Sequence, residues 1–88
     1  MAYSIELAKS IAKTLERIPA KQQRAIVEAI DGLKHNPRPS GTKKLKGEDG
    51  VYRIRVGEYR ILYEIEDKRL IIFILKVGGR KDIYRQFW

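Results

Sequence analysis

The sequence predicts an α+β fold with the element order β-α-α-β-β-β, in which a helical hairpin packs on a mostly antiparallel four-stranded sheet and a short C-terminal tail or helix follows. Three observations carry this prediction. Apolar residues recur at helical spacing in the first third of the chain, they alternate with polar residues after position 50, and Gly78-Gly79 ends the last apolar run. The length of 88 residues fits a single domain, residues 1–88.

The N-terminal elements are a short strand and two helices. Residues 2–7 alternate weakly and suit a strand that has no hairpin partner, so we expect it at a sheet edge or beside the last strand. Residues 8–18 and 22–33 carry apolar side chains at the helical period. Pro19 ends the first helix and can open the second, and Pro37 stops the second because the residue before a proline avoids the α region.

Residues 38–50 contain three glycines and no apolar period, which predicts a loop. Three strands follow, at about 51–56, 59–66 and 69–77, with a turn at Asp67-Lys68 between the last two. Residues 70–75 are apolar at odd and even positions alike. This pattern predicts a strand that is covered on both faces and is therefore central.

The first of these strands and its return carry the most information. Because successive side chains in a strand point to opposite faces, Ile54 and its alternate neighbours can enter the core while Arg53 and Arg55 project from the other face. Gly57-Glu58 fits a two-residue type II′ turn with glycine at positive φ. The pairs that follow from this turn are Val56 with Tyr59, Arg55 with Arg60, and Arg53 with Leu62.

Composition limits the classes of function. Nineteen Lys and Arg against eleven Asp and Glu leave a net charge of +8, which attracts nucleic acid first and an acidic protein or an anionic membrane surface next. A basic protein charged only for solubility is the alternative. The chain has no cysteine, which excludes disulfides and zinc–thiolate sites. The N-terminus lacks the pattern of a signal peptide and no apolar run could span a bilayer, so we expect a cytoplasmic protein.

The arginines are the candidate functional residues. Like charges directly opposite each other destabilise a sheet unless an anion or an acid lies between them. Guanidinium donors match phosphate oxygens, so Arg53, Arg55 and Arg60 suggest a phosphate cradle, with neutralisation by acids such as Glu64 as the structural alternative. The lone His35 at a helix end is expected to be a cap, and two-histidine metal sites are excluded.

A second pair of candidates follows the last strand. Arg80 and Tyr84 are four residues apart and would share a face if this segment is helical. A cation for the RNA backbone and a ring for an unstacked base are what single-stranded RNA requires. Alternatively, Tyr84 packs the tail on the core.

Four motifs, KKLKG, VYRIRVGEYRILYEI, IIFILKVGGR and KDIYR, together with the N-terminal AYSIELAKSIAKTLERIP, resemble the RelE/ParE superfamily of toxins from bacterial toxin–antitoxin modules. The resemblance covers nearly the whole chain and is closer to the RelE branch, because the basic residues and the late tyrosine are all present. It implies ribosome-dependent cleavage of messenger RNA in the A site, an acidic antitoxin as partner, and no cofactor or metal.

The resemblance also implies roles for single residues. Arg53 and Arg55 match strand positions of basic catalytic residues, Arg60 and Arg80 match the arginines that hold the scissile phosphate, and Tyr84 matches the aromatic residue that stacks on a base. Some members have lysine in place of Arg53 and Arg55, and arginine gives up its proton far less readily. The general base is therefore left open between a transiently neutral basic residue, Tyr84 and a group of the ribosome.

The implied reaction is attack of a ribose 2′-OH on the adjacent phosphate, which leaves a 2′,3′-cyclic phosphate and a 5′-OH. The basic loop residues Lys43, Lys44 and Lys46 are expected to contact RNA. Two other functions remain: a ParE-like inhibitor of DNA gyrase with the same fold, and a nucleic-acid-binding module that does not cut.

Overall fold

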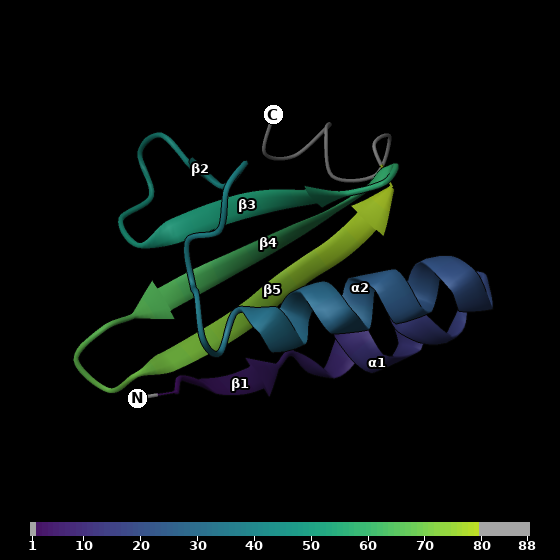
Figure 1. The fold of residues 1–88 in the computed structure, drawn as a ribbon, viewed down its shortest axis with the longest axis horizontal. Helices are drawn as coiled ribbons and strands as arrows, with labels where there is room; N and C mark the ends of the chain where they lie inside the picture. The colour runs from purple at the N-terminus through teal and green to yellow at the C-terminus, as the bar shows by residue number, and fades with distance from the viewer. Residues whose placement is uncertain (1, 80–88) are drawn as a thin grey trace.

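The protein folds as two helices packed on a five-stranded sheet (Figure 1). The structure, a computed structural model, describes residues 2–79. In chain order its elements are β1 (Ser4–Leu7), α1 (Lys9–Glu16), α2 (Ala20–Gly32), β2 (Lys43–Lys44), β3 (Val51–Val56), β4 (Tyr59–Glu66) and β5 (Ile71–Gly79). The predicted α+β class and the helical hairpin on a mostly antiparallel sheet are confirmed.

The sheet contains one more strand than the sequence predicted. The segment expected to be a loop contributes β2, whose two residues pair antiparallel with β3. A strand of two residues is too short to display the alternation by which strands are recognised in a sequence. The expectation of four strands was therefore wrong by this one element.

The strand order is β1-β5-β4-β3-β2. β1 pairs parallel with β5 at one edge, as expected for a first strand that has no hairpin partner, and the other neighbours are antiparallel. β5 has strands on both sides, which confirms an inner position. Its second face is incompletely covered, because Leu75 stays 40% exposed.

A register shift interrupts the β4–β5 ladder at the end of the apolar run of residues 70–75. Leu62 pairs with Lys76 but Tyr63 pairs with Ile74, so Leu75 is the extra residue of a β-bulge. The bulge reverses the alternation along β5. Ile74 and Val77 can therefore both join the core beneath the helices.

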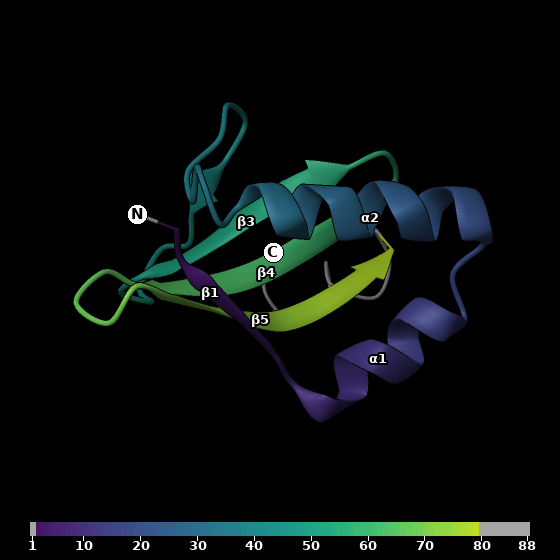
Figure 2. The same ribbon diagram turned by 60° about the horizontal axis from the view of Figure 1, so that its bottom comes forward.

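The core lies between the helices and one face of the sheet. Figure 2 shows the chain turning back from α1 into α2, which brings the apolar sides of both helices onto the sheet. α1 contributes Ile11 and α2 contributes Ile26 and Ile30. Full burial of each such side chain is worth about 1.5–3 kcal/mol. Neither of the two helices in the described part of the chain is long and apolar enough to cross a membrane.

Candidate functional site

The β3–β4 hairpin has the register that the sequence predicted. Arg55 lies opposite Arg60, and Arg53 lies opposite Leu62. Gly57 has φ +62°, whereas Glu58 keeps a negative φ, which fits a type II′ turn and excludes type I′. Because the pleat alternates, the three arginines lie on the sheet face opposite the helices.

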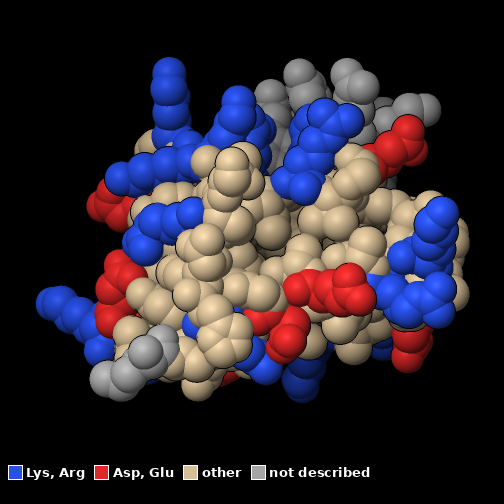
Figure 3. All heavy atoms as spheres, in the orientation of Figure 1, with Lys and Arg blue, Asp and Glu red and all other residues tan. Residues whose placement is uncertain are grey.

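These arginines border one cavity together with a lysine from β2. Lys43 pairs with Arg53 across the β2–β3 ladder, which places it on the same face. A cavity of about 310 Å³ is lined by Gly41, Lys43, Arg53, Ile54, Arg55 and Arg60. Lys and Arg side chains gather over the region of β2 and β3 in Figure 3. Four cationic side chains around a single cavity attract an anion, and phosphate oxygens match the forked donors of arginine.

One member of the cluster is held by the turn itself. The Nε of Arg55 donates a hydrogen bond to the carbonyl oxygen of Gly57 at 2.9 Å. This contact directs the exposed guanidinium toward the end of the hairpin and uses one of its five donors. The side chains of Arg53 and Arg60 are half-buried. The hairpin thus fixes the spacing of all three arginines and the direction of Arg55.

The three lysines expected to contact RNA lie in different places. Lys43 lines the cavity. Lys44 pairs with Tyr52 and so points to the other face of the sheet. Lys46 is exposed in the loop that follows β2. Their proximity in sequence therefore does not make them one group.

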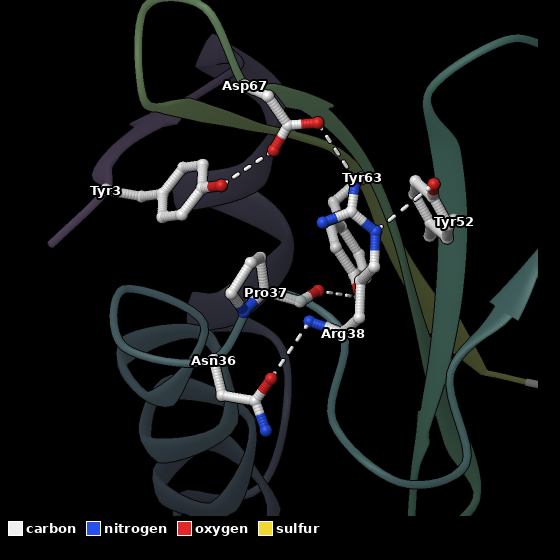
Figure 4. Close-up of polar contacts among 7 residues, drawn as sticks. All are labelled: Tyr3, Asn36, Pro37, Arg38, Tyr52, Tyr63 and Asp67. Atoms are coloured by element: carbon white, nitrogen blue, oxygen red, sulfur yellow. Dashed lines mark hydrogen bonds and ion pairs between the residues drawn. The ribbon is translucent and has the colours of Figure 1, made fainter. Parts of the chain in front are cut away.

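Arg38 forms a separate polar cluster that the sequence analysis missed (Figure 4). Its Nη2 lies 3.0 Å from Oδ2 of Asp67, and its Nε donates to the Tyr52 hydroxyl at 3.3 Å. The guanidinium carbon lies 5.1 Å from the centroid of the Tyr52 ring, a cation–π distance. The Tyr3 hydroxyl donates to Oδ1 of Asp67 at 2.6 Å. The cluster joins the N-terminus, the loop after α2, β3 and the turn after β4.

The hydrogen bonds in this cluster stabilise its charges. Those from Tyr3 and Arg38 lower the pKa of the Asp67 carboxyl. Those to Tyr52 and Asp67 raise the pKa of Arg38. The bond to the Asp67 carboxylate raises the pKa of the Tyr3 hydroxyl. Each charge is thus held by an identified partner within the fold, which indicates a structural role.

Tyr63 anchors the cluster to the core. Its side chain is fully buried, and its hydroxyl donates to the carbonyl oxygen of Pro37 at 2.7 Å, with Thr42 Oγ1 at 3.4 Å. Burial raises the pKa of this hydroxyl. The ring stacks on Tyr52 with centroids 6.1 Å apart. The hairpin register, continued to the pair of Tyr52 and Tyr63, was the sequence signal that could have located this contact.

Comparison with known proteins places the chain in a family. A family model described as "ParE toxin of type II toxin-antitoxin system, parDE" matches residues 5–84. The chain belongs to the RelE/ParE toxin superfamily. A protein of Methanocaldococcus jannaschii, "Putative toxin RelE1", is 35% identical over 97% of this chain and 98% of its own length. The "mRNA interferase toxin RelE" of Escherichia coli is 23% identical over 98% of this chain and 94% of its own.

A solved structure supports the same family at the level of the fold. The match is in the archaeal RelE–RelB complex from Pyrococcus horikoshii, with a TM-score of 0.82 and 32% identity, covering 93% of this chain and 99% of the matched chain. With relatives named RelE, the protein is a RelE-type toxin of a toxin–antitoxin system, and the resemblance drawn from its motifs is confirmed.

The resemblance assigned roles to five residues of this RelE-type toxin. The structure brings three of them, Arg53, Arg55 and Arg60, to one cavity. Arg80 and Tyr84 lie outside the described residues, so their roles remain predictions. Within the described chain, Gly78 of β5 pairs with Arg60, and the last described residue, Gly79, lies directly before Arg80.

Proposed function

We propose that this toxin is an endoribonuclease that cleaves messenger RNA in the A site of the ribosome and thereby inhibits translation. The observation that carries the proposal is the convergence of Arg53, Arg55 and Arg60 on one cavity of the sheet face away from the helices. The name of the E. coli relative, an mRNA interferase, supports the same substrate. The net charge of +8 favours a polyanionic target.

The proposed reaction is an internal transfer at phosphorus. The 2′-oxygen of a ribose attacks the adjacent phosphorus, the bond to the 5′-oxygen of the next nucleotide breaks, and that oxygen takes up a proton. The products are a 2′,3′-cyclic phosphate and a 5′-OH. Negative charge builds on the phosphoryl oxygens in the transition state, and each preorganised donor that meets it can contribute about 2.7–4 kcal/mol.

The arginines supply charge rather than a base. A guanidinium stays protonated near neutral pH, so the cluster can stabilise the phosphorane-like state without a metal ion. In this proposal Arg60 and Arg80 hold the scissile phosphate, and Tyr84 stacks on a base. The proton of the 2′-OH is accepted by Tyr84 or by a group of the ribosome. Such a site depends on the ribosome to align the 2′-oxygen with the phosphorus.

We also propose an acidic antitoxin as the partner of this toxin. The matched chain of the P. horikoshii structure comes from a RelE–RelB complex, and those from M. jannaschii and Mycobacterium tuberculosis come from toxin–antitoxin complexes as well. A charge of +8 would steer an acidic partner, and the association rate should fall as salt screens that field. An association rate that is indifferent to salt would contradict electrostatic steering.

The test is induction in a bacterium with mapping of mRNA 5′ ends. We expect new 5′ ends inside translated codons for the wild type. They should be absent for the double variant Arg53→Ala/Arg60→Ala and retained for Arg69→Ala, whose guanidinium pairs with Glu66 outside the cavity. Growth arrest with intact mRNA and broken DNA would contradict the proposal and favour a ParE-like inhibitor of gyrase, the alternative that shares this fold.

A further inference from the structure

We infer that Lys43 and Arg53 hold the phosphate next to the scissile one, so that the cavity accepts two consecutive phosphates of a single RNA strand. This inference rests on the proposed function, because it takes RNA as the ligand of the cavity. It gives Lys43 a role in positioning the substrate, and it separates Lys43 from the neighbouring Lys44.

The first reason is the spacing of the four cations. Lys43 and Arg53 are cross-strand neighbours, as are Arg55 and Arg60. Neighbouring strands lie about 4.8 Å apart, and two residues along a strand span about 6.6 Å. The backbone positions of Lys43 and Arg60 are therefore separated by two strand spacings across the sheet and by two residues along a strand. Together these components give a diagonal distance of roughly 12 Å. This distance is much wider than one phosphate group.

The second reason is the direction of Arg55. Its hydrogen bond to the carbonyl oxygen of Gly57 draws the guanidinium toward the hairpin turn, away from β2. The cations thus form two pairs: Arg55 with Arg60 near the turn, and Lys43 with Arg53 at the β2 edge. The same cavity of about 310 Å³ touches both pairs.

The third reason is the chemistry of the two pairs. Two guanidiniums offer forked donors for a phosphate whose charge grows during the reaction. The other pair has one guanidinium and one lysine ammonium, and the ammonium acts as a point charge, which suits a phosphate that is held but does not react. A phosphodiester chain presents one phosphate at every nucleotide, so an RNA strand can fill both positions at once. Two anchored phosphates would fix the position of the scissile bond along the strand.

Lys44 is the matched control for Lys43. The two residues are adjacent, both are exposed, and both belong to the two-residue strand β2. Lys43 pairs with Arg53 on the cavity face, and Lys44 pairs with Tyr52 on the opposite face. Lys43→Gln and Lys44→Gln therefore change the net charge equally, and a difference between them reports the position of the charge.

The experiment measures binding of a 2′-O-methyl oligoribonucleotide, which has no 2′-OH to attack and cannot be cleaved by the proposed reaction. Fluorescence anisotropy over a range of salt concentrations gives the slope of log affinity against log salt. Loss of one phosphate contact on a single strand should reduce this slope by about 0.7. We expect this reduction for Lys43→Gln, a slope close to wild type for Lys44→Gln, and recovery for Lys43→Arg.

Equal slopes and affinities for Lys43→Gln and Lys44→Gln would overturn the inference, and so would salt-independent binding by the wild type. Cleavage of mRNA on programmed ribosomes is measured with the same proteins and tests the proposed function separately. A wild type that binds the oligonucleotide but leaves ribosomal mRNA intact would overturn the nuclease function. The slopes of log affinity against log salt for the two lysine variants would still decide whether Lys43 contacts a second phosphate.

Discussion

Arg38 and Arg60 are the same type of residue in two different settings, and the comparison separates structure from function. Arg38 meets a carboxylate and a phenol hydroxyl and lies over an aromatic ring. Arg60 lies directly across the hairpin from Arg55, and both line a cavity with Arg53 and Lys43. In the first setting a carboxylate of the fold faces the guanidinium. In the second, three further cations line the same cavity, where an anion can enter.

The two settings should therefore respond differently to the loss of a guanidinium. Removal of a charge from the cavity should affect activity and leave stability unchanged or raised, because like charges repel across a sheet. Removal of a member of the Arg38 cluster should affect stability and spare activity.

Replacement of Arg60 by alanine should lower cleavage of mRNA on programmed ribosomes by roughly 100-fold or more, the usual cost of losing one preorganised donor. The melting temperature should not fall. Arg53→Ala should lower cleavage by a smaller factor, because its guanidinium is assigned to the neighbouring phosphate, and it should not lower the melting temperature either. Loss of secondary structure in both variants, measured by circular dichroism, would show that these arginines support the fold instead.

Tyr63→Phe should lower the free energy of unfolding by about 1–3 kcal/mol, because the carbonyl oxygen of Pro37 loses its buried donor while the ring is kept. Denaturant unfolding measures this change, and cleavage per folded molecule should stay at the wild-type level. Tyr59→Phe, at a half-buried tyrosine on the same strand, is the control. Equal stability of Tyr63→Phe and the wild type would contradict the assigned hydrogen bond.

Arg38→Ala should have a smaller effect on stability, about 0.5–1.5 kcal/mol, because its side chain is 43% exposed and solvent screens its ion pair with Asp67. Most of the loss comes from the hydrogen bond to Tyr52 and from the cation–π contact. Arg69→Ala, at another exposed ion pair, serves as the control. A fall in cleavage without a loss of stability would place Arg38 at the active site rather than in the scaffold.

The smallest expected effect is a change in the free energy of unfolding at acidic pH. The pKa of Asp67 is lowered in the folded protein, so its contribution to stability is complete above the pKa of the unfolded chain. That contribution is lost as the pH falls through the lowered value. Unfolding curves of the wild type and Asp67→Asn should therefore differ near neutrality and converge in acid. A difference that stays constant at all pH values would exclude the carboxylate charge as its cause.

The sequence predicted the hairpin cluster because every step is local. A two-residue turn fixes the register, and the register fixes which face each arginine occupies. The sequence identified Lys43 as a candidate RNA contact but did not show which face of the sheet it occupies. That face depends on the pairing of β2 with β3, which leaves no pattern in the sequence. The Arg38 cluster could not be predicted from local patterns in the sequence. Its contacts to Asp67 join residues 29 and 64 positions apart, and no periodicity encodes such a distance.

The position of β5 between β1 and β4 has a consequence for synthesis of the toxin. The β3–β4 hairpin can close as soon as its residues are available, but β1 must wait for residues 71–74, which follow it by more than sixty positions. The exit tunnel encloses the newest part of a nascent chain, so the first strand stays without its partner until residues 71–74 have left the tunnel. The sheet of this toxin is thus completed only after its helices and its β3–β4 hairpin have been made.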